Sequence, residues 1–208
     1  MKETIIASKN IRFEGDGYSD EWMEEALNRG LPNICHVPEA IMKFNDPQSR
    51  SVLIGENIFN DNELKCRIEV ELEKYTKKVQ IESRILGDLA INHIVPTAVI
   101  YQNRLLENLR GLRETFSPEE YEMLGADRRE LVKEIQLHIL EIKKLVYEMT
   151  EARKISNHLE SEIKKAYSYQ EMVSPYLEKI REHIDHLELE IDDEIWPLPK
   201  YRELLFTK

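Results

Sequence analysis

The chain has 208 residues, 41% of them hydrophobic, and a formal net charge of −11 from 29 basic and 40 acidic side chains. Nucleic-acid binding takes most of its affinity from cations that meet phosphates, so this charge argues against DNA or RNA as a partner. The most apolar stretch, residues 85–100, contains Asp88, Asn92, His93 and Pro96 and is too short to cross a bilayer, so no membrane partner is expected either.

The first residues, Met1–Thr4, lead directly into polar sequence, which predicts no secretory signal. Cys35 and Cys66 are far apart and match no metal or redox spacing, so two reduced thiols are expected. Together these features predict a cytoplasmic protein.

Only 7 Gly and 8 Pro interrupt the chain, and apolar residues recur at helical spacing. The expected fold is all-α: an antiparallel bundle of long helices with a small irregular helical N-terminal lobe and an extended C-terminal tail. The lobe is expected at residues 1–58, the bundle at 59–195 and the tail at 196–208, as one compact unit. The long helices are expected over residues 60–115, 127–165 and 170–195.

In the lobe, Ser19 is expected to cap a short helix that ends before Gly30 and Pro32. Two further short helices are expected near Pro38 and at Asp46–Pro47, because proline suits the first turn of a helix.

The first long helix is expected to begin with a capping box formed by Asn60 and Glu63. An apolar stripe then predicts a packed seam: Leu64, Ile68, Leu72, Tyr75 and Val79. Over residues 81–100 the apolar residues surround the whole helix, which predicts the most buried part of the chain. Pro96 removes one backbone donor and is expected to kink the helix.

Ser117, Pro118 and Glu120 predict a strongly capped helix start, and Gly125 is expected to end that short element. A second long helix follows with a seam formed by Leu131, Ile135, Ile139, Ile142, Leu145, Val146 and Met149. The third carries Ile180, Ile184, Leu187 and Ile191, and it starts either at a capping box formed by Ser168 and Glu171 or at Ser174–Pro175.

The tail is expected to dock on a surface, because exposed aromatic side chains forfeit a few kcal/mol of burial. Its candidate docking residues are Trp196, Tyr201 and Phe206.

Two sets of polar residues are candidate sites. His183, His186 and Glu190 lie at i, i+3 and i+7, a spacing that could hold zinc, although the neighbouring apolar seam favours a solvated flank. Asp88, Asn92 and His93 lie on the most apolar helix. They are interpreted either as part of a site or as buried polar groups that bond one another or repair the backbone at Pro96.

No self-contained catalytic site is expected. Gly15-Asp16-Gly17 lies among acidic residues and is interpreted as a turn rather than a phosphate loop. The sequence contains no nucleophile–base pattern, no Gly-x-Ser-x-Gly and no Walker loop. Catalytic, cofactor-binding and metal-binding residues are therefore predicted to be absent from this chain.

Several short segments follow one another in an order and spacing that span nearly the whole chain; the weakest part is 117–170, where only helical character agrees. They are residues 8–19 (SKNIRFEGDGYS), 29–33 (RGLPN), 80–84 (QIESR), 87–96 (GDLAINHIVP), 101–103 (YQN), 187–188 (LE), 196–201 (WPLPKY) and 204–206 (LLF). In these segments the chain resembles the C-terminal region of the type III glutamine synthetases, the long-chain bacterial class.

The resemblance implies a parent enzyme that joins glutamate and ammonia at the expense of ATP, with Mg²⁺ or Mn²⁺ held by a β-barrel upstream. It also implies homo-oligomeric rings, so that the partners are the upstream catalytic domain and neighbouring subunits. None of the family's metal-, ATP- or glutamate-binding residues matches this chain, which is therefore expected to have a structural role in assembly. The alternative is a free-standing acidic adaptor or regulator that binds a basic partner.

Overall fold

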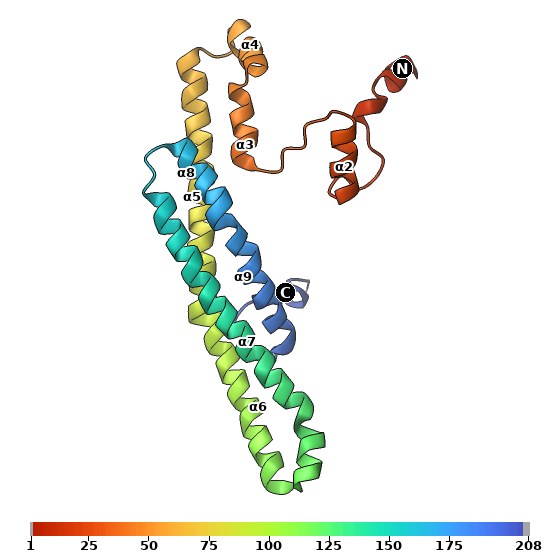
Figure 1. Cartoon of the computed structure of the whole chain (residues 1–208), viewed down its shortest axis with the longest axis vertical. Helices are drawn as coiled ribbons and strands as arrows, with labels where there is room; N and C mark the ends of the chain where they lie inside the picture. The colour runs from red at the N-terminus through yellow and green to blue at the C-terminus, as the bar shows by residue number, and fades with distance from the viewer. Residues whose placement is uncertain (1, 206–208) are drawn as a thin grey trace. The chain divides into compact units, whose positions relative to one another are not determined.

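A computed structural model describes residues 2–205, which form helices and loops without a strand (Figure 1). The predicted all-α fold is thereby confirmed. The chain divides into two compact units, residues 1–68 and 69–208, and the long helix α5 (Asp61–Leu89) contains that boundary. The divisions expected after residues 58 and 195 stay predictions.

The first unit contains short helices, including those expected after Ser19, near Pro38 and at Asp46–Pro47. They are α1 (Lys2–Ala7), η1 (Lys9–Ile11), α2 (Asp20–Asn28), α3 (Val37–Met42), η2 (Lys43–Asn45) and α4 (Pro47–Gly55). The Ser19 cap is confirmed, because the Trp22 amide donates to the Ser19 hydroxyl at 3.3 Å. Gly30 then takes the left-handed conformation (φ +69°) that ends such a helix, which glycine adopts without steric cost.

The start of α5 follows the expected capping box. The Asn60 backbone N–H donates to the Glu63 carboxylate at 2.8 Å, and the Glu63 backbone N–H donates to the Asn60 side-chain oxygen at 2.9 Å. Four residues of the predicted stripe are buried, namely Leu64, Ile68, Leu72 and Val79, and the fifth, Tyr75, is half-buried against the core.

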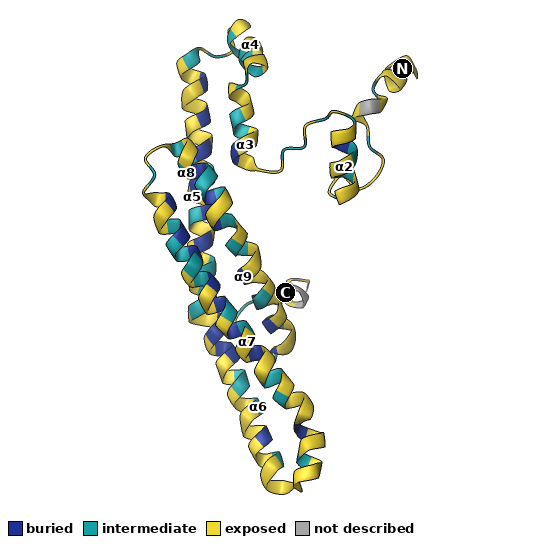
Figure 2. Cartoon of the chain, in the orientation of Figure 1, coloured by how far each residue is buried: buried dark blue, intermediate teal, exposed yellow. Residues whose placement is uncertain are grey.

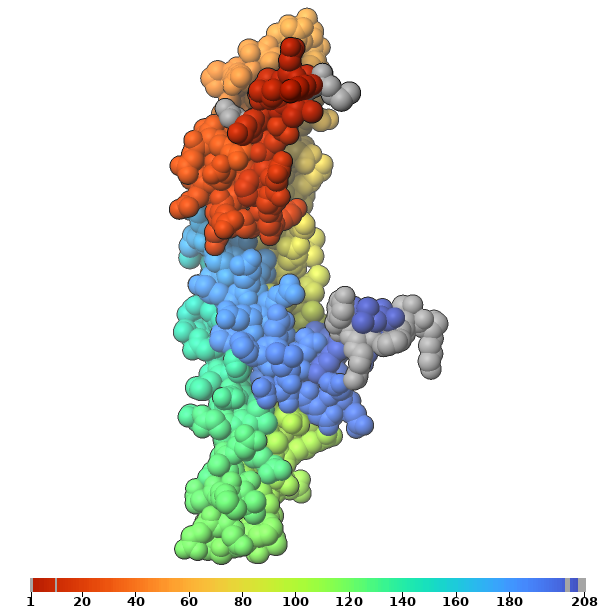
Figure 3. Space-filling view, turned by 90° about the vertical axis from the view of Figure 1, so that its right-hand side faces the viewer, coloured from red at the N-terminus to blue at the C-terminus, as the bar shows by residue number. Residues whose placement is uncertain are grey.

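The second unit is built from three rods of helix. The first rod continues from α5 through a π-helical turn, η3 (Ala90–Ile94), into α6 (Val95–Thr115). The second is α7 (Pro118–Asn157), and the third comprises α8 (Glu162–Ser168), the π-helical turn η4 (Tyr169–Val173) and α9 (Ser174–Glu190). Neighbouring rods are antiparallel, and α7 contacts both α6 and α9 (Figures 1 and 3). A short helix, α10 (Tyr201–Leu204), follows near the end.

One hydrophobic core runs between the rods (Figure 2). The predicted seams of the second and third helices supply it: Ile135, Ile139, Ile142, Leu145, Met149, Ile180, Ile184, Leu187 and Ile191 are all buried. Side chains four or three residues apart fall on one face of a helix, so this spacing directs them to a common interior.

Gly125 does not end a helix, so that expectation is wrong. It lies inside α7, which is continuous from its capping box at Ser117 to Asn157. A β-carbon at Gly125 would stand 3.2 Å from Leu109 Cδ2 of α6. The glycine therefore provides room for a neighbouring helix, which a sequence scan cannot distinguish from a stop signal.

The predicted limits of the next two helices also need correction. α7 ends at Asn157 rather than near 165, and Ser161 caps α8 by accepting from the Lys164 amide at 3.5 Å. The third rod thus begins at Glu162 and ends at Glu190, while Ser168 and Ser174 lie within it. The earlier start allows Ala166, Tyr169 and Val173 to be buried in the unit.

The two π-helical turns share one sequence feature. η3 ends two residues before Pro96, and η4 ends two residues before Pro175. A proline ring clashes with the carbonyl of the residue four positions earlier, and the wider turn relieves that clash without ending the helix. The local irregularity predicted at Pro96 is therefore a π-helical turn.

The prediction that residues 81–100 are the most buried stretch is wrong. Ala90, Ile94, Val95 and Ala98 are buried, but four apolar side chains of the same stretch are exposed: Ile81 (56%), Ile85 (54%), Val99 (40%) and Ile100 (53%). This rod has neighbours within its unit on only part of its circumference, so one apolar side stays uncovered.

Candidate functional site

Asp88, Asn92 and His93 lie around the π-helical turn η3, and all three are exposed. The expectation that they are buried is therefore wrong. The interpretation that they bond one another holds in part, because the Asn92 amide donates to the Asp88 carboxylate at 2.6 Å. Their contribution to an active site stays a prediction.

The backbone around Pro96 is partly satisfied by a neighbour. The Thr97 hydroxyl donates to the His93 carbonyl at 2.9 Å, one residue past the Asn92 carbonyl that faces the proline. Thr97 is a buried residue of α6, and the repair of the Asn92 carbonyl by the side chains of Asp88, Asn92 or His93 stays a prediction.

His183 and His186 of α9 meet His138 of α7, a residue that sequence reasoning missed. The Nδ1 atoms of His138 and His183 are 2.9 Å apart, a hydrogen-bond distance. The His138 ring centroid lies 5.1 Å from both other imidazoles, edge-on to His183 and stacked on His186. The three side chains form the histidine cluster (His138, His183 and His186).

The histidine cluster lines a cleft of about 350 Å³ between α7 and α9. Glu190 lines it as well, together with Glu134 and Glu141 of α7. Among the described residues, no group of three or more His, Cys, Asp or Glu side chains is arranged to hold a metal ion. Cys35 and Cys66 are exposed free cysteines, as expected for reduced thiols.

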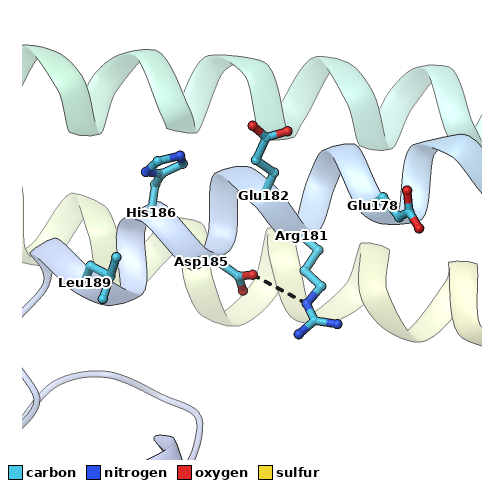
Figure 4. A pocket seen from close by; sticks show the side chains of 6 residues that line it. All are labelled: Glu178, Arg181, Glu182, Asp185, His186 and Leu189. Carbon is cyan, nitrogen blue, oxygen red and sulfur yellow. Dashed lines mark ion pairs between the residues drawn. The ribbon is translucent and has the colours of Figure 1, made fainter. Parts of the chain in front are cut away.

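His186 also borders a shallower hollow along α9, whose lining is drawn in Figure 4. Arg181 and Asp185 pair there at 3.5 Å, while Glu182 and His186 point to the other side of the helix. An ion pair of such exposed side chains contributes little to stability, so this hollow is interpreted as a solvated helix face.

Trp196, the first candidate docking residue, is buried and belongs to the core of the second unit. The side chain of Lys200 holds the segment that follows Trp196 against the end of α9. Its ammonium group donates to the Glu188 carbonyl at 2.6 Å and to the Asp193 carboxylate at 2.5 Å, and it lies 5.9 Å from the Trp196 ring centroid. A cation at the carbonyl end of α9 also suits the helix dipole.

The remaining docking candidates cannot be placed. The side chain of Tyr201 and the whole of Phe206 lie outside the described residues. Leu204 and Leu205, which separate them, are exposed. A docking role for the tail beyond Trp196 stays a prediction.

The fold and these surfaces define a class of protein: a module of antiparallel helices that pack on one another through the apolar seams described above. No helix in residues 2–205 has the length and apolar character that crossing a bilayer requires.

The comparisons with known proteins name the family. Residues 1–113 match the model of the glutamine synthetase C-terminal domain. The whole chain is 71% identical to a glutamine synthetase of Bacteroides fragilis (strain YCH46), 30% identical to a type-3 glutamine synthetase of Dictyostelium discoideum and 27% identical to a glutamine synthetase of Butyrivibrio fibrisolvens.

This chain belongs to the glutamine synthetase C-terminal domain family. The likeness to the type-3 protein agrees with the type III class that the resemblance implied. The chain spans 28%, 28% and 29% of the lengths of the three relatives. The comparisons do not favour a free-standing adaptor.

Proposed function

We propose that this chain is the C-terminal assembly module of a type III glutamine synthetase and supplies no catalytic residue of its own. The parent enzyme would form glutamine from glutamate, ammonia and ATP in the cytoplasm. ATP and Mg²⁺ or Mn²⁺ would bind to the rest of that protein, and its subunits would form rings. The module would pack against the rest of the same protein and against neighbouring subunits.

One observation carries the proposal: the exposed apolar side of the first rod, which we call the α5–α6 face (Ile81, Ile85, Val99 and Ile100). Apolar side chains left in water forfeit the free energy of burial, and a continuous uncovered set is typical of an interaction surface. Asp88, Asn92 and His93 lie on the same stretch and would supply the polar contacts of such an interface.

The outer face of α7 offers a comparison. It also exposes apolar side chains, such as Leu140 (53%) and Tyr147 (67%), but they lie among ion pairs that join residues three apart in sequence. Residues 137–156 contain seven charged side chains, whereas residues 81–100 contain three: Glu82, Arg84 and Asp88. Interface centres are depleted of charge, so the α5–α6 face is the better candidate.

The first test uses the chain alone. Given ATP, glutamate, ammonium and magnesium, the 208-residue chain should form no glutamine, because none of its side chains is predicted to bind these substrates. Detectable turnover by the chain would overturn the proposal.

The second test uses the full-length enzyme with Ile81→Glu and Ile85→Glu together, and Leu140→Glu with Tyr147→Glu as the matched control. All four side chains are between 53% and 67% exposed, so folding of the module should tolerate both changes equally. Native mass should fall, and glutamine synthesis with it, in the first variant only. Equal native masses for both variants would contradict an assembly role for this face.

A further inference from the structure

The histidine cluster places two imidazole nitrogens where their protonation states depend on each other. The Nδ1 atoms of His138 and His183 are 2.9 Å apart, so one must carry a hydrogen and the other must accept it. Two neutral rings meet this condition, and so does one imidazolium beside one neutral ring. Two imidazolium rings cannot, because both Nδ1 atoms would then carry hydrogens and both rings a positive charge.

The third histidine makes additional protonation more costly. The His186 ring is stacked on His138 with an interplanar angle of 22° and a centroid distance of 5.1 Å. A charge on His186 would therefore face the same ring that His183 contacts. Like charges at this separation repel, and the repulsion is stronger where the rings are partly shielded from water.

The charged groups around the cluster come from both helices. Glu134 and Glu141 of α7 and Glu190 of α9 line the cleft, and His186 also lines the hollow along α9 together with Glu178, Arg181, Glu182 and Asp185. Burial lowers the pKa of His138, charges on His183 and His186 lower it further, and Glu134 raises it in part. The Glu134 carboxylate thus opposes the lowering of the His138 pKa without cancelling it.

We propose that the histidine cluster is an acid-sensitive joint, at which a second proton on the facing imidazole pair breaks the Nδ1–Nδ1 hydrogen bond and loosens α9 from α7. At neutral pH the bond joins the two helices beside the apolar seam. Ile135 and Leu187 line the same cleft, so the separation exposes apolar surface that the neutral cluster keeps covered. This inference does not depend on the proposed function.

The sign of the pH dependence follows from linkage. The unfolded or opened chain has ordinary histidines that protonate near about pH 6.5. Because the pKa of His138 is lowered in the packed form, packed His138 binds fewer protons near that pH than opened His138 does, so acid favours the opened form. Opening should increase by about tenfold for each unit by which the pKa of His138 differs between the packed and opened forms.

Hydrogen exchange of the 208-residue chain tests the proposal at about pH 7.5 and pH 5, where most carboxylates stay ionised. After correction for intrinsic rates, amides of α9 should lose protection at the lower pH. His138→Asn keeps a hydrogen-bonding group near the Nδ1 position but cannot gain a proton, so it should retain protection. His158→Asn, an exposed residue at the end of α7, is the matched control and should behave like the unchanged chain.

Equal loss of α9 protection in the unchanged chain and in His138→Asn would overturn the proposal, as would no loss in either. Should His138→Asn fail to fold, proton NMR of the unchanged chain decides. The His138 ring should then titrate at a lower pH than the histidine of a model peptide. Titration at or above the peptide's pH would also overturn the proposal.

Discussion

Gly125 of α7 lies so close to Leu109 of α6 that a β-carbon on the glycine would stand 3.2 Å from Leu109 Cδ2. The same β-carbon would lie 3.4 Å from the Tyr121 ring. The absence of a side chain therefore sets how closely the two helices approach near their connecting turn. A glycine in a helix interior costs conformational entropy, and this one offsets the cost by close packing.

Gly125→Val should destabilise the chain by about 1–3 kcal/mol, because a branched side chain overpacks this contact. The matched control is Gly111→Ala in α6, where nothing lies within 4 Å of the added β-carbon. That change should stabilise the chain by about 0.5–1 kcal/mol through helix propensity. Urea denaturation measures both, and the same sign for the two variants would contradict the packing role of Gly125.

Tyr169→Phe should cost about 0.5–1.5 kcal/mol of unfolding free energy. The Tyr169 side chain is fully buried, and its hydroxyl donates to the Asn157 side-chain oxygen at 2.7 Å, joining η4 to the end of α7. Tyr147→Phe is the control, since Tyr147 is 67% exposed and should change stability by less than about 0.5 kcal/mol. Equal effects would show that the buried hydrogen bond contributes nothing.

The same tyrosine predicts a response to alkali. Burial raises the pKa of Tyr169 above its ordinary value. Its contribution to stability is thus fully present below the unfolded pKa of about 10 and is lost as the pH rises toward the folded value. Melting temperatures measured from neutral pH to above pH 10 should fall more steeply for the unchanged chain than for Tyr169→Phe. Parallel curves would exclude this linkage.

Ser117→Ala should cost about 1 kcal/mol, because it removes the hydroxyl that accepts from the Glu120 amide at 3.3 Å. Ser161→Ala provides the comparison, since its bond to the Lys164 amide is 3.5 Å long and a smaller loss is expected. Chemical denaturation followed by circular dichroism measures both. A larger loss for Ser161→Ala would contradict the ranking by bond length.

Glu120 completes this cap and makes it sensitive to acid. Hydrogen bonds from the backbone and then the side chain of Ser117 lower the pKa of Glu120. Stability from the pair is present above the unfolded pKa of the carboxyl and is lost as the pH falls through the lowered folded value. Glu120→Gln should therefore show a shallower decline in melting temperature below about pH 4.5 than the unchanged chain. An unchanged slope would refute the assignment.

Trp196→Ala should cost about 3 kcal/mol, because a large aromatic side chain leaves the core of the second unit. Leu189→Ala, at an 83% exposed position just before the end of α9, should stay within about 0.5 kcal/mol. Guanidinium denaturation followed by circular dichroism measures the unfolding free energy of both variants. Tryptophan fluorescence can be used as well for the Leu189 variant, which keeps Trp196. A small loss for Trp196→Ala would mean that the tail does not stabilise the bundle.

Local chemistry in the sequence was enough to place several helix starts. Ser19, Asn60 and Ser117 each satisfy backbone amides within three residues of themselves, so their caps need no distant partner. The seams were equally predictable, because the spacing of apolar residues determines which side of a helix carries them.

The histidine cluster shows where such reasoning stops. His138 flanks the seam of α7, and His183 and His186 flank that of α9. Although His138 and His183 are 45 residues apart in sequence, the register between the two helices brings them together. Only a known register would have brought His138 into the candidate site. The exposure of Ile81 and Ile85 was also unpredictable, because the apolar content of a helix does not show how many neighbouring helices cover it.

The sequence alone determined which residues are apolar, where helices can start and which side of each carries the seam, because these properties depend on bonds and spacings within a few residues. The tertiary structure decided whether Gly125 stops a helix or admits a neighbour, how the first rod accommodates Pro96, and which imidazoles meet. Those outcomes depend on the distance and register between rods, which only the packing of the assembled helices establishes.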